Sequence, residues 1–145
     1  MRDRKCGDCI ACCVYLKINT ETLVKRRCEH CPNLNLNNPV EANVMQLSSE
    51  EPVKCSIYAD RPDVCREYRC LWIDGHGEEQ DRPDRSLVLI DTLDEIENGL
   101  QCKPLSPGGE DDPSVQATIR RMMASTGSAA LVADFYERKI VRVMV

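Results

Sequence analysis

The second half of the chain has the clearest pattern of apolar and polar positions. Residues 86–91 contain an apolar run of the length that buried strands have. Asn98-Gly99 favours a tight turn, so residues 100–105 are predicted to return as the second strand of a hairpin. Residues 129–134 and 139–145 are two further apolar segments on either side of a polar stretch. They predict a second hairpin.

A helix is predicted between the two hairpins. Ser114 is a residue type that caps helices, and apolar residues follow it at helical spacing up to about residue 125. They would form one apolar face, made of Val115, Ile119, Met122 and Met123. The second half is therefore predicted to be an α+β part with hairpins and one helix.

The first half has a different composition. The chain has 145 residues and ten cysteines, and nine of these lie between Cys6 and Cys70. Large aromatic side chains are few in the whole chain, with one Trp, four Tyr and one Phe. We therefore expect residues 1–80 to form a small cysteine-cluster module organised by metal. Residues 81–145 would pack on it as the α+β part, separately or as one continuous domain, after a polar, glycine-containing break at 74–81.

Charge and hydropathy narrow the function classes. The 24 acidic side chains exceed the 19 basic ones, for a net charge of −5. This balance disfavours a nucleic-acid partner, and the basic run Lys25-Arg26-Arg27 is more simply explained by solubility or charge compensation. No apolar run approaches the ~20 residues that span a bilayer, and the N-terminus lacks an apolar leader. We expect a cytoplasmic protein without membrane contact, in a compartment where thiols persist.

The first cysteine cluster runs from Cys6 to Cys13. Cys-x-x-Cys pairs suit metals because a short turn lets two sulfurs approach one ion, to about 2.3 Å each for zinc. Cys12 and Cys13 are adjacent, and adjacent side chains point apart in a helix or strand. This segment therefore predicts either two nearby mononuclear sites or one polynuclear cluster.

Two further groups complete the set. Cys28 and Cys31 form another Cys-x-x-Cys pair, with His30 more simply exposed than ligating. Cys65 falls near the start of a helix predicted from Asp60-Arg61-Pro62, where the helix dipole favours thiolate. The predicted metal ligands are Cys6, Cys9, Cys12, Cys13, Cys28, Cys31, Cys55, Cys65 and Cys70.

Other chemistries are weaker interpretations of the same residues. Disulfides fit the even number of cysteines, but a cytoplasmic address and two Cys-x-x-Cys spacings favour metal. A thioredoxin-type pair normally follows a strand, whereas Cys6 is close to the N-terminus. Asp74, His76 and Glu78-Glu79 are candidate acid–base groups of a metalloenzyme near Trp72, but a polar loop is the simpler interpretation. The sequence does not establish an enzyme.

Three ordered motifs resemble a known family. The run Cys-x-x-Cys-x-x-Cys-Cys at 6–13, then Cys28 to Cys31, then Cys-Ser-Ile-Tyr-x-x-Arg-Pro-x-x-Cys-Arg at 55–66, resembles the YkgJ-type cysteine-cluster proteins. These are described as zinc- or iron-chelating domains, sometimes as iron–sulfur proteins. The resemblance covers roughly the first half and implies metal binding rather than a reaction. The family is described with eight cysteines, and this region has nine.

Two functions follow from these patterns. The first is a metal-binding protein that holds zinc or iron through thiolates, in two mononuclear sites or one polynuclear site. The alternative is an iron–sulfur protein in electron transfer or redox chemistry, because Cys-x-x-Cys-x-x-Cys at 6–12 resembles ferredoxin spacing. Metal ions are the partners that the sequence identifies, and a protein partner stays unidentified.

Overall fold

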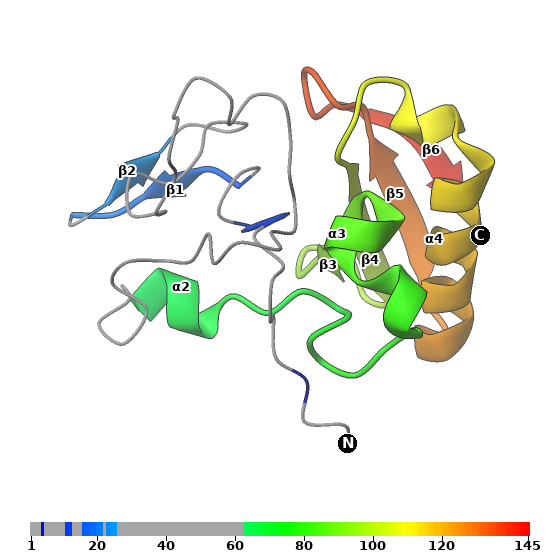
Figure 1. Ribbon diagram of the computed structural model, residues 1–145, viewed down its shortest axis with the longest axis horizontal. Coiled ribbons are helices and arrows are strands. Elements are labelled where there is room, and N and C mark those ends of the chain that lie inside the picture. The colour runs from blue at the N-terminus through cyan, green and yellow to red at the C-terminus, as the bar shows by residue number, and fades with distance from the viewer. Residues whose placement is uncertain (1–3, 5–10, 13–15, 22, 26–62) are drawn as a thin grey trace. The chain divides into compact units, whose positions relative to one another are not determined.

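The computed structural model describes Arg4 and residues 11–12, 16–21, 23–25 and 63–145 (Figure 1). Its contacts divide the chain into two compact units. The larger unit consists of Met1–Lys5 with Arg69–Val145, and the smaller unit is Cys6–Tyr68. Residues 69–80, which the sequence analysis grouped with the cysteine module, thus belong with the larger unit. Each unit is described by itself below.

The larger unit is built on a four-stranded sheet. Its strands are β3 (Val88–Thr92), β4 (Gly99–Pro104), β5 (Ala129–Ala133) and β6 (Ile140–Met144), in the order β3-β4-β5-β6. Both β3–β4 and β5–β6 are antiparallel, which confirms the two predicted hairpins. The central pair β4–β5 is parallel, with α4 (Pro113–Thr126) in the connection between them. Helices and strands together confirm the α+β class.

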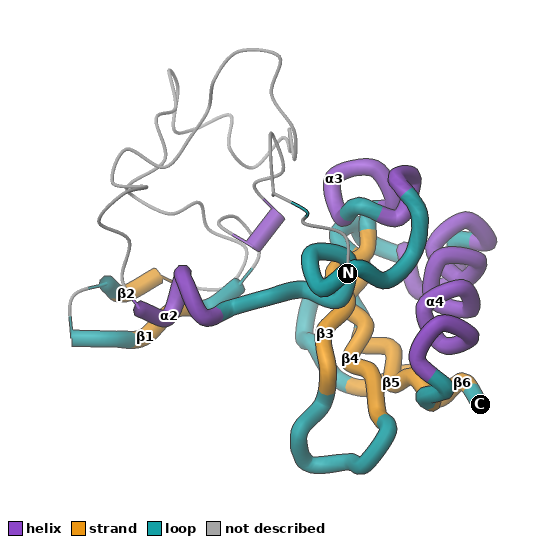
Figure 2. The backbone as a smooth tube through the Cα atoms, turned by 90° about the horizontal axis from the view of Figure 1, so that it is seen from below, coloured by secondary structure: helices purple, strands orange, loops and turns teal. Residues whose placement is uncertain are grey.

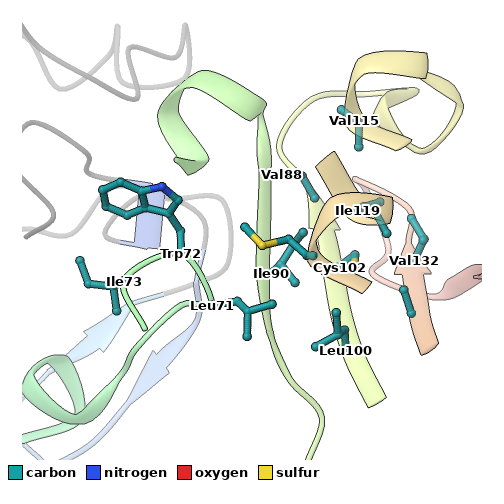
Figure 3. Packing of buried hydrophobic residues seen from close by; sticks show 12 residues of the cluster. Leu71, Trp72, Ile73, Val88, Ile90, Leu100, Cys102, Val115, Ile119 and Val132 are labelled. Carbon is teal, nitrogen blue, oxygen red and sulfur yellow. The ribbon is translucent and has the colours of Figure 1, made fainter. Parts of the chain in front are cut away.

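Helix α4 covers one side of this sheet (Figure 2). Its residues Val115, Ile119 and Met122 are buried, as the periodicity predicts. They belong to one apolar cluster with side chains of the sheet, namely Val88, Ile90, Leu100, Cys102, Ala130 and Val132. Figure 3 shows Ile119 beside Cys102 and Val132. The helix cap differs by two residues from the prediction: the Asp112 side chain, rather than Ser114, accepts a hydrogen bond from the Ser114 N–H at 2.8 Å.

Three short elements lie in the loops before and after the first hairpin of the sheet. They are the 3₁₀ turn η3 (Glu79–Asp81), α3 (Pro83–Ser86) and, after β4, the 3₁₀ turn η4 (Gly109–Asp111). None of them is long enough to show a hydrophobic period, which is why the pattern did not predict them. The segment predicted as a polar break, 74–81, lies within the larger unit; residues 74–80 are exposed or half-buried, whereas Asp81 is 1% exposed and belongs to the folded interior.

Leu71 and Trp72 are buried and lie outside any helix. Helix α2 (Asp63–Glu67) ends before them, and they lie in a turn. They join the same apolar cluster as the sheet residues (Figure 3).

In the smaller unit the structure describes α2 and a short hairpin. Strand β1 (Ile18–Asn19) pairs antiparallel with β2 (Val24–Lys25) across a turn in which Leu23 N–H donates to Thr20 Oγ1 at 3.0 Å. Lys25 is 4% exposed, and its ammonium donates to the Leu16 carbonyl. Burial disfavours the solubility role for Lys25, one of the two predicted for the basic run, and the other two residues of that run lie outside the described residues. The alternating pattern at 53–58 is typical of a short strand, and it lies outside the described residues.

Candidate functional site

Three of the predicted cysteine ligands lie among the described residues. Cys12 and Cys65 belong to the smaller unit and Cys70 to the larger, and all three are half-buried. Cys65 is the third residue of α2, so the prediction of a first-turn position is confirmed. The other six predicted ligands lie outside the described residues; they are Cys6, Cys9, Cys13, Cys28, Cys31 and Cys55.

Cys102 differs in its burial from the three predicted ligands that the structure describes. Its side chain is completely buried on β4, among the residues that pack beneath α4 (Figure 3). Burial, together with the negative charge of Asp91, raises the pKa of the Cys102 thiol to about 12. A metal ligand must be a thiolate, so this position is unsuited to metal.

Within the parts of the chain that the structure describes, no group of three or more His, Cys, Asp or Glu side chains gathers in a metal-binding arrangement. The ligand set predicted from the sequence therefore depends on the cysteines outside those parts. The three described cysteines offer sulfur donors, which are the ligand type that zinc and iron–sulfur clusters take.

Directly after Cys70 the chain forms a fixed turn. Leu71 N–H donates to the Ile90 carbonyl on β3 at 2.7 Å, and His76 N–H donates back to the Leu71 carbonyl at 3.3 Å. Trp72 is 5% exposed, and its indole Nε1–H donates to the Glu78 carbonyl at 2.9 Å. The turn is thus attached both to the sheet and to the segment that follows it.

Two glycines allow the tight path of this turn. Gly75 and Gly77 have φ values of +103° and +76°, a region that side chains with a Cβ rarely adopt. A Cβ at Gly77 would also lie 2.7 Å from Met122 Cε and 2.9 Å from Asp81 Oδ2. Glycine at position 77 thus lets the turn pack against α4 without left-handed strain and without displacing the Met122 and Asp81 side chains.

Arg4 binds to this turn from the start of the chain. Its Nη1 donates to the carbonyls of Trp72 and His76, both at 2.8 Å, and its Nη2 donates to the Gly77 carbonyl at 2.7 Å. The guanidinium carbon also lies 4.6 Å from the centre of the Trp72 ring, within cation–π range. We call this group of contacts the Arg4 clamp. The sequence gives no local signal for it, because the partners are 68 or more positions apart.

A buried carboxylate holds the end of the turn against α4. Asp81 Oδ1 accepts from Thr118 Oγ1 at 3.0 Å and from Arg121 Nη2 at 2.6 Å, and Oδ2 accepts from Glu78 N–H at 2.8 Å. Burial by itself would raise the pKa of Asp81, but the hydrogen bonds from Arg121, Glu78 and Thr118 outweigh it, so the pKa is lowered. The sequence analysis did not identify Asp81, Thr118 or Arg121.

The acid–base groups suggested around Trp72 have separate local partners. His76 Nδ1 lies 2.7 Å from Ser125 Oγ on α4. Asp74 forms an ion pair with Arg69, and Glu79 lies 3.5 Å from an Arg85 guanidinium nitrogen. These three partners belong to different elements, so the described contacts favour a structural loop over a shared acid–base centre.

None of the helices among the described residues is both long enough and apolar enough to cross a bilayer. Comparisons of the chain with known protein families, with curated proteins and with solved structures found no match.

Proposed function

We propose that this chain is a metal-binding protein that holds zinc through a cluster of cysteine thiolates, in two mononuclear sites or one polynuclear site. The observation that carries the proposal is the placement of nine cysteines within the first 70 residues, two groups of them at Cys-x-x-Cys spacing. That spacing lets neighbouring sulfurs reach one ion without a long loop. The ligands are the nine named above, and Cys102 is excluded because its thiol is sealed in the core.

The contrast between the two units supports a structural role for the metal. The larger unit has its own apolar core, with Leu100, Ile119 and Val132 each 1% exposed. In the smaller unit, the described elements are strands of two residues and a helix of five. Elements this short contribute few hydrogen bonds. A structural zinc site contributes of order 10 kcal/mol of folding free energy.

The resemblance to the YkgJ-type proteins supports metal binding and carries no reaction with it. Eight thiolates suffice for two closed Cys₄ zinc sites, which leave no open coordination position. We therefore do not propose an enzyme. A cytoplasmic location fits, since a reducing compartment keeps the thiols available to metal.

An iron–sulfur cluster is the second candidate. It is favoured by the run Cys6-x-x-Cys9-x-x-Cys12, which has the spacing of bacterial ferredoxins. The ferredoxin motif continues with a Cys-Pro pair after three intervening residues, and this chain has Leu16-Lys17 there. Zinc and a cluster are easily separated, because an iron–sulfur cluster absorbs visible light and zinc does not.

The test is elemental analysis of protein purified without oxygen, counting zinc, iron and sulfide per chain. About two zinc ions without sulfide support closed Cys₄ sites, whereas iron with sulfide supports the alternative. Cys65→Ser should lower the metal content, and Cys102→Ser is the matched control that should leave it unchanged. Protein with no bound metal, which also takes up none when zinc or iron and sulfide are supplied, would contradict both candidates.

A further inference from the structure

We propose that Arg4 is a positioning residue for the cysteine site. Through the Arg4 clamp, it would hold the two ends of the cysteine-rich segment at one point of the larger unit. The inference rests on the proposed metal-binding function and adds a residue that is not itself a ligand. Its basis is the set of contacts that Arg4 makes with the turn after Cys70.

The guanidinium is held by three acceptors and one ring. The carbonyls of Trp72, His76 and Gly77 each accept one N–H, at 2.7–2.8 Å, and the Trp72 indole lies 4.6 Å from the guanidinium carbon. A planar, forked cation fits such a set of acceptors, whereas the ammonium of lysine is a single point with no flat face. The clamp should therefore depend on arginine rather than on positive charge alone.

The acceptors of the clamp are themselves immobilised. The hydrogen bond from Leu71 to Ile90 ties the turn to β3, and the Trp72 indole bonds to Glu78. Gly77 lies so close to α4 that a Cβ at this position would displace the end of the Met122 side chain. Arg4 thus binds to a preformed surface of the larger unit, and Arg4 itself is half-buried there.

The clamp lies next to both ends of the predicted ligand set. Cys6 follows Arg4 by two residues, and Cys70 precedes Trp72 by two. Consecutive Cα atoms are 3.8 Å apart, so each of these cysteines has its Cα within about 8 Å of the Cα of a clamp residue. However the cysteines are grouped into sites, the clamp limits how far the first and last ligands can separate.

Holding the two ends of the cysteine-rich segment together before metal binds should raise the affinity of the cysteine site for metal. A chain whose ends are already held loses less conformational entropy when its ligands converge on an ion. Metal binding and clamp formation then favour each other, and couplings of this kind change affinity by roughly 5–150-fold. We expect about a tenfold effect for the clamp.

The experiment is a zinc titration of the metal-free, reduced full-length protein against a chromophoric chelator. Arg4→Ala and Arg4→Lys should each bind as many zinc ions as the wild type, with affinity about tenfold lower. Arg120→Ala is the matched control, because Arg120 is exposed on α4 and its removal also deletes one positive charge. It should bind zinc as tightly as the wild type.

A second readout follows the clamp itself. Trp72 is the single tryptophan, so its emission reports on the clamp directly. In the metal-free protein, Arg4→Ala should differ from the wild type in Trp72 emission, because the guanidinium no longer lies over the Trp72 ring. Identical emission of the two proteins would overturn the clamp. Wild-type affinity in both Arg4 variants would overturn the inference and leave the proposed function standing. A wild type that binds no zinc would overturn both.

Discussion

The buried carboxylate of Asp81 offers the sharpest test of how the larger unit is held together. In Asp81→Asn, one carboxylate oxygen becomes an NH₂ group that can only donate. The Glu78 N–H and the Arg121 guanidinium both donate to this side chain, so a donor must now face a donor. The hydrogen bond from Thr118 can be retained by the remaining oxygen.

The cost follows from these contacts. Leaving the Glu78 N–H without an acceptor costs about 1–2 kcal/mol. The ion pair adds about 1 kcal/mol, less than a fully buried pair would, because the Arg121 side chain is 41% exposed and partly screened. We expect Asp81→Asn to lower the free energy of unfolding by about 2–3 kcal/mol at neutral pH.

The effect should depend on pH. Because the pKa of Asp81 is lowered below 3.8 on folding, the ionised carboxylate stabilises the folded state. This contribution is complete above about pH 5 and is lost as the pH falls through the folded-state pKa. The difference between wild type and Asp81→Asn should therefore shrink in acid.

The assay is urea unfolding followed by Trp72 emission, since Trp72 is 5% exposed in the folded larger unit. Glu79→Gln is the control, because the Glu79 side chain is 61% exposed and its loss should change little. A variant Asp81→Asn within about 0.5 kcal/mol of the wild type at pH 7 would refute this account of the carboxylate. So would a difference that persists unchanged at pH 2.

Three further predictions concern the turn, the buried thiol and the metal. Gly77→Ala should destabilise the larger unit by about 2 kcal/mol, measured by the same urea unfolding, because it adds left-handed backbone strain and a methyl group 2.7 Å from Met122; unchanged stability would contradict the packing. The Cys102 thiol, with its pKa at about 12, should resist iodoacetamide at pH 8 in native protein and react after unfolding, as peptide mass spectrometry would reveal. Chelating the metal should make Cys6–Tyr68 sensitive to protease while the larger unit stays resistant. Equal resistance of both units without metal would argue against a metal-organised segment.

Local patterns in the sequence were sufficient for the regular elements of the second half. Strand length, the Asn98-Gly99 turn and the apolar stripe of α4 are all encoded within a few neighbouring residues, and each was predicted close to its observed place. The separation of Cys102 from the other nine cysteines was also visible in the spacing alone. The burial of the Cys102 thiol gives a chemical reason why this cysteine is not a metal ligand.

Contacts between distant residues decided the rest. The segment 74–81 looks polar because it contains carboxylates and glycines, yet Asp81 is buried by partners on α4 that are 37 and 40 positions away. The Arg4 clamp joins residues 68 to 73 positions apart. Neither hydrophobic periodicity nor secondary-structure propensity indicates such pairs, because both depend only on residues that are close in the sequence. The sequence by itself determined the strands and the long helix of the second half and indicated the candidate ligands. The tertiary structure decided which polar groups are buried, since burying a charge requires partners that only folding brings together.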